Sequence, residues 1–123
     1  MYVLLAGDLE KERRALKQLL EQDSELNVVG EATEARALLA QLQESRPDLV
    51  LLEWGLPGLR ADELLPALRC LGHSVKVVVF GERAETHQEA LAAGADAFVS
   101  KQEPAEELLN TVRAVGGLSP CYV

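Results

Sequence analysis

One run in the chain is apolar at every position, Leu49-Val50-Leu51-Leu52, and it lies between two acidic residues. A strand with one solvent-facing side alternates apolar and polar residues, whereas a strand buried on both faces has no such alternation. We therefore predict a central strand of a parallel sheet over residues 48–53, ending at Glu53. Parallel neighbours need crossover connections, usually helical, so this strand favours an α/β fold.

Strand-like and helix-like segments alternate along the rest of the chain. Short apolar, β-branched segments predict further strands over residues 2–6, 26–30, 75–80 and 95–99. Amphipathic or capped segments predict helices over 9–22, from Thr33 to before Pro47, through 64–71, over 84–93 and over 104–115. The apolar face of the first helix consists of Leu9, Leu16, Leu19 and Leu20. In the third helix, Pro66 is tolerable only within about the first turn.

Five strands alternating with five helices predict a doubly wound parallel sheet with helices on both faces. The 123 residues suffice for one domain, which we assign to residues 1–115, with residues 116–123 as a linker or C-terminal tail. Such a sheet places its working site beyond the carboxyl ends of the strands. The positions found there are Gly7, Asp8, Glu53, Gly81 and Lys101.

Composition excludes several functional classes. The net charge of -8 and the pI of about 4.7 argue against direct binding to nucleic acid or to an anionic membrane, and only Arg13 and Arg14 are adjacent cations. Cys70 and Cys121 lack the spacing of a zinc site, a redox motif or a disulfide framework, which is typical of reduced thiols in the cytosol. The apolar start is too short for a signal peptide, so we expect a cytoplasmic protein.

Two longer segments carry a family resemblance. Residues 47–58, Pro-Asp-Leu-Val-Leu-Leu-Glu-Trp-Gly-Leu-Pro-Gly, and residues 92–101, Ala-Ala-Gly-Ala-Asp-Ala-Phe-Val-Ser-Lys, resemble the third-strand and fifth-strand segments of the receiver domains of two-component response regulators. Residues 27–32 and 106–109 extend the resemblance over nearly the whole chain. It implies a flavodoxin-like sheet of strand order 2-1-3-4-5. Residues 114–120 are similar to the junction between receivers and the helix-turn-helix domains of transcription regulators.

The resemblance implies a phosphorylation pocket, and this sequence departs from it at three positions. Glu53 stands at the position of the phosphoaccepting Asp, Gly7 at that of the first metal-binding acid, and Gly81 at that of the switch Thr or Ser. Asp8 and Lys101 match the family residues. Because one carboxylate is missing and the acceptor side chain is one methylene longer, we expect weak Mg²⁺ binding or none, with Asp8 as the one candidate metal ligand, and no other cofactor.

Several side chains leave alternatives open. We expect Lys101 to form a permanent ion pair with Glu53 or Asp8. Glu53 acts either as a mimic of phosphorylated Asp or as a simple loss of function. Phe98 matches the receiver's switch aromatic, but a static strand residue is favoured once Gly81 replaces its partner. We interpret Trp54 as a pocket cover rather than a partner contact, and His73 and His87 as solvated surface residues.

These observations predict a non-enzymatic receiver with a degenerate phosphorylation site, belonging to a transcription regulator of a two-component system. It would act as a phosphorylation-independent interaction or dimerisation module, with a sensor kinase or a second copy of itself as partner. The alternative is a functional receiver that uses Glu53 as an unconventional phosphoacceptor. A small-molecule binder is suggested by fold alone, and no Gly-rich phosphate loop supports it.

Overall fold

The computed structural model describes residues 1–58, 60–70, 75–82 and 84–118, in which strands and helices alternate. In chain order the elements are β1 Tyr2–Ala6, α1 Glu10–Glu21, β2 Asn27–Ala32, α2 Ala35–Ser45, β3 Leu49–Glu53, α3 Ala61–Arg69, β4 Lys76–Gly81, α4 Ala84–Ala92, β5 Ala97–Ser100 and α5 Ala105–Val115. The strands pair in parallel in the order β2-β1-β3-β4-β5. The predicted fold class and strand order are therefore confirmed.

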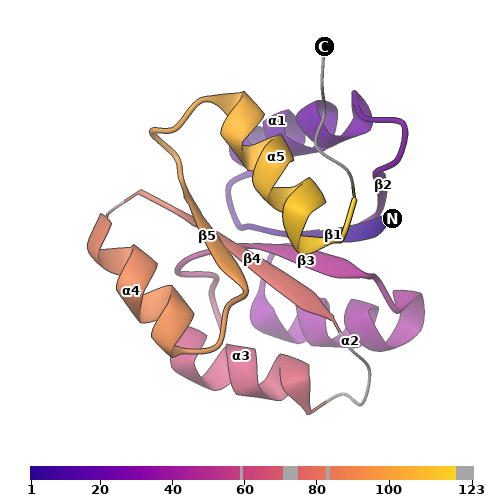
Figure 1. The fold of residues 1–123 in the computed structure, drawn as a ribbon. Coiled ribbons are helices and arrows are strands. Elements are labelled where there is room, and N and C mark those ends of the chain that lie inside the picture. Colours follow the sequence, from indigo (N-terminus) through magenta and orange to yellow (C-terminus); the bar gives the residue numbers. More distant parts are fainter. Residues whose placement is uncertain (59, 71–74, 83, 119–123) are drawn as a thin grey trace.

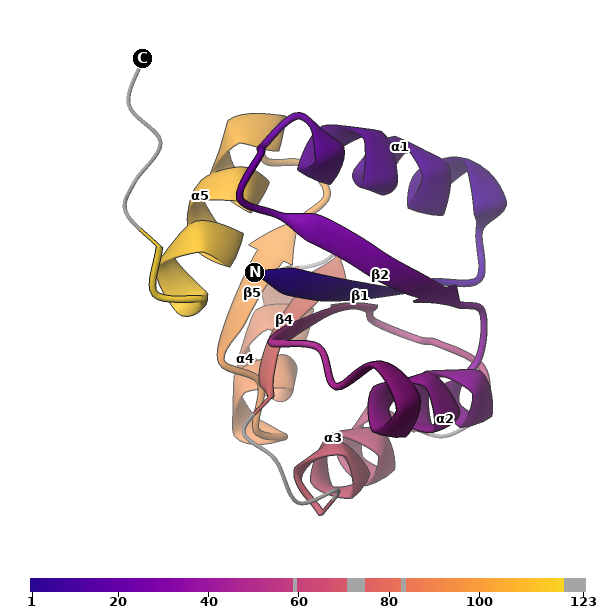
Figure 2. The same ribbon diagram turned by 90° about the vertical axis from the view of Figure 1, so that its right-hand side faces the viewer.

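Helices cover both faces of the sheet, with α1 and α5 on one face and α2, α3 and α4 on the other (Figures 1 and 2). Each face has its own apolar core. Successive residues of β3 alternate between the two, because side chains along a strand point to opposite faces. Leu49 and Leu51 belong to the core under α1 and α5, and Val50 and Leu52 belong to the other. The central position predicted for this strand is thereby confirmed.

The start of α1 differs from the expectation. Leu9 is the N-cap residue and is 51% exposed, so it does not contribute to the buried face. The helix itself begins at Glu10, and its contact with the core is made by Leu16, Leu19 and Leu20.

The start of α2 also differs, because Glu34 rather than Thr33 is its N-cap and no side chain caps it. The N–H of Ala35 instead donates to the carbonyl of Pro57, 2.8 Å away in the loop after β3. A tertiary backbone contact thus satisfies one of the free N–H groups at the start of the helix.

The expectation for Pro66 was wrong, because this proline is the sixth residue of α3. Its exposed ring avoids crowding the core, while Leu64, Leu65 and Leu68 are buried on the opposite side. The burial of these leucines offsets the hydrogen bond that proline cannot donate. Leu71, expected in the same helix, lies outside the described residues.

The last helix ends in a glycine motif that folds the chain back onto the domain. Gly117 has a φ of +79°, its N–H donates to the carbonyl of Ala114, and the N–H of Leu118 donates to the carbonyl of Arg113. These two bonds are the Schellman pattern. The Leu118 side chain packs against the core under α1 and α5. The domain boundary after residue 115 stays a prediction.

The final turn of α5 is also tied to the start of the molecule. Arg113 is buried and forms ion pairs with Asp23 and Glu25, which lie between α1 and β2, at 2.5 and 2.8 Å. Burial opposes the charge of Asp23, but the Glu25 N–H and Arg113 lower the pKa of its carboxyl below the ordinary value. None of the helices described is long and apolar enough to cross a bilayer.

We expect Leu51→Ala to lower the free energy of unfolding by about 2–5 kcal/mol, because this side chain is 1% exposed and its removal leaves a cavity. Urea unfolding followed by Trp54 fluorescence measures the change. Leu91→Ala is the matched control, since Leu91 is 43% exposed on α4 and its truncation should change stability by less than about 0.5 kcal/mol. Equal losses in the two variants would contradict the central position of β3.

Candidate functional site

The carboxyl ends of the strands meet at one edge of the sheet. The N–H of Trp54 donates to Phe80 O at 2.9 Å, and the N–H of Lys101 donates to Gly81 O at 2.8 Å. These bonds extend the sheet register one residue beyond β3 and β5. Since side chains alternate along β3, Glu53 lies on the same face as Leu49 and Leu51, toward α1 and α5.

Lys101 is the centre of the site. Its ammonium donates to Glu53 Oε1 at 2.9 Å and to Glu12 Oε2 at 2.8 Å. We call these three residues the acid–lysine cluster. The Phe80 ring lies beside the ammonium, with its centroid 5.2 Å from Nζ, close enough for a cation–π contact. The pairing expected between Lys101 and Glu53 is therefore present.

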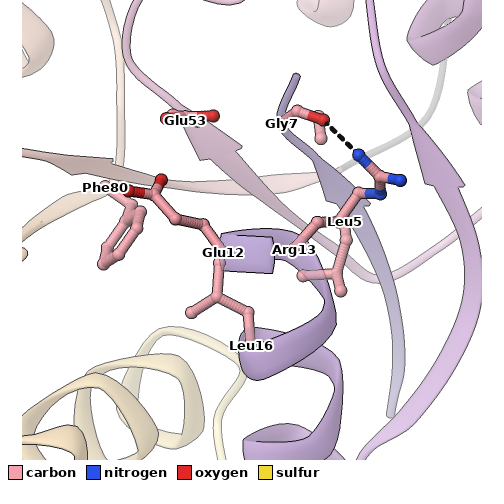
Figure 3. Close-up of a pocket in the computed structure, with 8 residues that line it drawn as sticks. Leu5, Gly7, Glu12, Arg13, Leu16, Glu53 and Phe80 are labelled. Atoms are coloured by element: carbon pink, nitrogen blue, oxygen red, sulfur yellow. Dashed lines mark hydrogen bonds between the residues drawn. The ribbon is translucent and has the colours of Figure 1, made fainter. Parts of the chain in front are cut away.

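Glu12 was missed in the sequence and reaches the cluster from the first turn of α1. Figure 3 shows it among the residues that line the pocket, with its side chain extending from α1 toward Glu53 and Phe80. One signal could have revealed it. Glu12 lies four residues before Leu16 and seven before Leu19, which places a carboxylate on the face of α1 that packs against the sheet.

The two carboxyl groups of the cluster have opposite electrostatic surroundings. Burial raises the pKa of Glu53 above the ordinary value, and the neighbouring Glu12 adds to this effect against the influence of Lys101. The hydrogen bond from Lys101 lowers the pKa of Glu12 despite partial burial. Burial disfavours the ammonium, but its hydrogen bonds to Glu12 and Glu53 raise the pKa of Lys101. Lys101 therefore stays charged at neutral pH.

Gly7 makes room for the Glu53 side chain. A Cβ atom at residue 7 would lie 2.9 Å from Glu53 Oε2, closer than such atoms approach in real structures. Arg13 holds the same glycine from the other side, because its Nη1 donates to Gly7 O at 3.0 Å (Figure 3). The Glu53 carboxylate thus occupies space that a side chain at residue 7 would need.

The remaining predicted residues lie apart from the cluster. Asp8 is exposed and forms no ion pair within the described part of the chain, so of the two acids considered for Lys101 only Glu53 pairs with it. Gly81 is buried at the end of β4. Phe98 is half-buried and packs against the core of the opposite face. His87, expected to be solvated, is exposed but stacks on Phe98 with 5.2 Å between ring centroids.

Trp54 does not cover the pocket, contrary to the expectation. Its indole is half-buried against the core of the α2, α3 and α4 face and is absent from the pocket lining. The alternation along the chain explains this, since residue 54 faces away from residue 53. His73 and Cys121 lie outside the described residues, and Cys70 is an exposed free thiol.

The residues present do not fit the divalent cation that a receiver pocket implies. Glu53 directs Oε1 to Lys101, and its Oε2 takes the room that a side chain at residue 7 would need. Asp8 stands alone, and no group of three or more ligating residues suited to a metal exists among the residues described. A Mg²⁺ site requires several oxygen ligands in near-octahedral geometry.

The sequence matches the family described as response regulator receiver domain over residues 3–113. The chain belongs to this family. Among curated relatives, the nitrate/nitrite response regulator protein NarL of Escherichia coli is 33% identical over 114 residues, which cover 89% of this chain and 52% of NarL. The DNA-binding transcriptional activator DevR/DosR of Mycobacterium tuberculosis is 36% identical over 121 residues, covering 93% of this chain and 54% of that protein. The receiver thus spans about half the length of these relatives.

Solved receiver structures have the same fold. The signal receiver domain of NarL from Mycobacterium tuberculosis superposes with a TM-score of 0.86 at 24% identity, covering 94% of this receiver and 95% of that chain. The response regulator domain of Thermotoga maritima CheB gives a TM-score of 0.84 at 25% identity and covers 98% of both chains. The predicted membership in the receiver family is confirmed.

We expect Lys101→Met to lower the free energy of unfolding by roughly 3 kcal/mol at pH 7, because two neighbouring carboxylates lose their shared counterion. This loss of stability should become smaller when the pH is below the ordinary Glu pKa, because protonation removes the repulsion between Glu12 and Glu53. Denaturant unfolding at pH 7 and pH 4 measures both effects. Lys11→Met, at an exposed position on α1, is the matched control and should change little at either pH. A pH-independent loss would contradict the electrostatic account.

We expect Gly7→Ala to displace the Glu53 carboxylate, because the added methyl group would lie 2.9 Å from Oε2, and to cost up to about 1 kcal/mol, since Oε2 is the end of a flexible side chain. Glu53→Asp shortens the acid and should relieve this overlap. A double-mutant cycle of unfolding free energies therefore tests the steric pairing. Strict additivity of the two substitutions would show that residues 7 and 53 are independent.

Proposed function

We propose that this receiver works without regulated phosphorylation, as a non-catalytic protein-interaction module of a cytoplasmic transcription regulator. The observation that carries the proposal is the acid–lysine cluster, in which Lys101 is engaged by two carboxylates of its own chain. In a receiver that is phosphorylated, this lysine must be available to the oxygens of the incoming phosphoryl group. Here an internal anion already holds it.

The acceptor chemistry supports the same proposal. Phosphorylation would require a Glu53 oxygen to attack phosphorus in line with the leaving group, and a misplacement of about 1 Å can cost on the order of a hundredfold in rate. The Glu53 side chain is 10% exposed and hydrogen-bonded to Lys101. Its longer side chain and its low exposure both work against that geometry, and the misfit for Mg²⁺ removes the usual charge neutralisation.

The output side of the pocket supports it as well. Gly81 offers no hydroxyl that could bind a phosphoryl group, so a modification at Glu53 would lack that contact to the segment after β4. Phe98 packs on the opposite face of the sheet with His87 stacked on it. The proposal therefore assigns signalling to protein contacts, with a second copy of the chain or a sensor kinase as partner, whatever the state of Glu53.

The relatives support an assignment to transcription regulation. NarL is named a response regulator and DevR/DosR a DNA-binding transcriptional activator, and the matched region is about half of each. The net charge of this receiver is -8, and Arg13 and Arg14 are its only adjacent cations in the sequence, which does not favour DNA binding by this region. We assign it the regulatory half of such a protein.

Incubation of the receiver with a small-molecule phosphodonor and Mg²⁺, followed by intact mass measurement, tests the proposal. We expect no added phosphoryl group within a time that fully modifies a phosphorylatable receiver run in parallel. An adduct that appears in this chain and disappears in Glu53→Gln would overturn the proposal in favour of Glu53 as an unconventional acceptor.

A pair of substitutions sharpens this result. Gly7→Asp alone should not restore Mg²⁺ binding, because the Glu53 carboxylate occupies the room beside residue 7. Gly7→Asp combined with Glu53→Asp should bind Mg²⁺ measurably by isothermal titration, because it places two shorter acids next to Asp8. Equal binding by the single and the double variant would contradict the claim that Glu53 blocks the site.

A further inference from the structure

The acid–lysine cluster contains more acid than base. With all three residues ionised, its two carboxylates and one ammonium leave one excess negative charge. The side chains of Glu53 and Lys101 are 10% and 16% exposed, and that of Glu12 is 35% exposed. An excess charge at such a shielded place is unfavourable, because little water remains to solvate it.

The two acids are also close to each other. The carboxyl groups of Glu12 and Glu53 both accept a hydrogen bond from the one Lys101 ammonium, at 2.8 and 2.9 Å, so an oxygen of each acid lies against the same cation. Two carboxylates that share a site resist double ionisation, and one proton between them turns the repulsion into a hydrogen bond.

The charged groups around the pair do not remove the imbalance. On α1, the Arg13 guanidinium is committed to Gly7 O and to Glu31 Oε1 at 3.0 and 2.9 Å. After β4, the carboxylate of Glu82 lies 4.0 Å from the Lys101 ammonium, is 72% exposed and adds further negative charge. On the remaining sides, Gly7 and Phe80 contribute no charge, and Asp8 is exposed. Lys101 is thus the one cation paired with the two acids within the described residues.

We propose that the acid–lysine cluster is a proton-binding site, in which the Glu53 carboxyl takes up one proton from solvent while Glu12 stays ionised. The proton bonds to a Glu53 oxygen, and the resulting O–H donates to a Glu12 carboxylate oxygen. No other covalent bond changes. Lys101 keeps its ion pair with Glu12, and its bond to Glu53 is no longer an ion pair and weakens. This inference deepens the proposed function and rests on it, because a pocket that held a phosphoryl group or a metal would titrate differently.

Glu53 rather than Glu12 takes the proton because it is the more buried acid. Glu53 ends the strand that is buried on both faces, whereas Glu12 lies on a surface helix with access to water. Burial raises the pKa of Glu53, and the bond from Lys101 lowers that of Glu12, so the two directions diverge. Ionisation of Glu53 therefore lowers the stability of the folded state as the pH rises from the ordinary Glu value through the raised one.

Proton uptake would be felt on the surface of the domain. Glu12 and Lys101 line an open groove along α1, together with Leu16, Leu19, Phe80 and Ala105. When Glu53 is protonated, the contact between Glu53 on β3 and Lys101 weakens, while the contact between Glu12 on α1 and Lys101 persists. The charge of the groove then becomes less negative, and the segment between β5 and α5 is held less firmly.

Nuclear magnetic resonance titration of the glutamate side-chain carboxyl carbons in the full chain tests this inference, in buffer containing a chelator. We expect Glu53 to titrate at a higher pH than Glu12, and the backbone amides of residues 12–16 and 101–105 to follow the Glu53 midpoint. Glu12→Gln should move the Glu53 midpoint downward, because the neighbouring acid no longer opposes its ionisation. Glu53→Gln should abolish the upper transition at those amides.

Glu89→Gln is the matched control and should leave the Glu53 midpoint in place, since Glu89 is exposed on α4, which covers the opposite face of the sheet. A Glu53 midpoint at or below that of Glu12, or an upper transition that survives Glu53→Gln, would overturn the inference. Should Glu53→Gln fail to fold, the shift in Glu12→Gln decides alone. The outcome is separable from the phosphodonor experiment, because an adduct there would refute the proposed function whether or not the two acids titrate apart.

Discussion

The burial of β3 on both faces is the constraint on which the rest of this receiver depends. Leu49, Val50, Leu51 and Leu52 are each at most 1% exposed, so no charge can be placed within the strand. A polar group can enter only where the strand ends. Glu53 occupies that end, and the alternation along the strand aims it at α1 and α5 rather than at the opposite face. The position of the pocket is therefore a result of the packing of the core.

Within the pocket, the residue at position 7 depends on the residue at position 53. The longer acid at residue 53 reaches Lys101 with Oε1, and its Oε2 lies 2.9 Å from where a Cβ atom of residue 7 would be. The absence of a side chain at residue 7 and the longer acid at residue 53 are therefore sterically linked, and the Glu53 carboxylate pairs with Lys101 of the same chain.

The sequence was sufficient for the fold and for bringing Gly7, Glu53 and Lys101 to one place, and the reasons are physical. Apolar runs and helical spacing determine which residues are buried, and burial decides the element order, so the central strand and Lys101 could be placed in advance. Glu12 was missed because its role in the site depends on a tertiary contact with Lys101, which is 89 residues away in the chain. Trp54 was misplaced because the prediction rested on its being the only tryptophan in the sequence. The alternation of side chains along the strand turns it away from Glu53.

The helix α5 is attached to the rest of the domain at both of its ends. It begins just after Lys101 and closes with the Gly117 turn, where Arg113 joins Asp23 and Glu25. Its eleven residues span about 16 Å. Leu118 therefore lies toward the edge of the sheet opposite the pocket. A displacement of Lys101 can therefore be transmitted to that edge through α5. Because contacts hold the chain before the helix and at its end, α5 should shift as a rigid body rather than unwind.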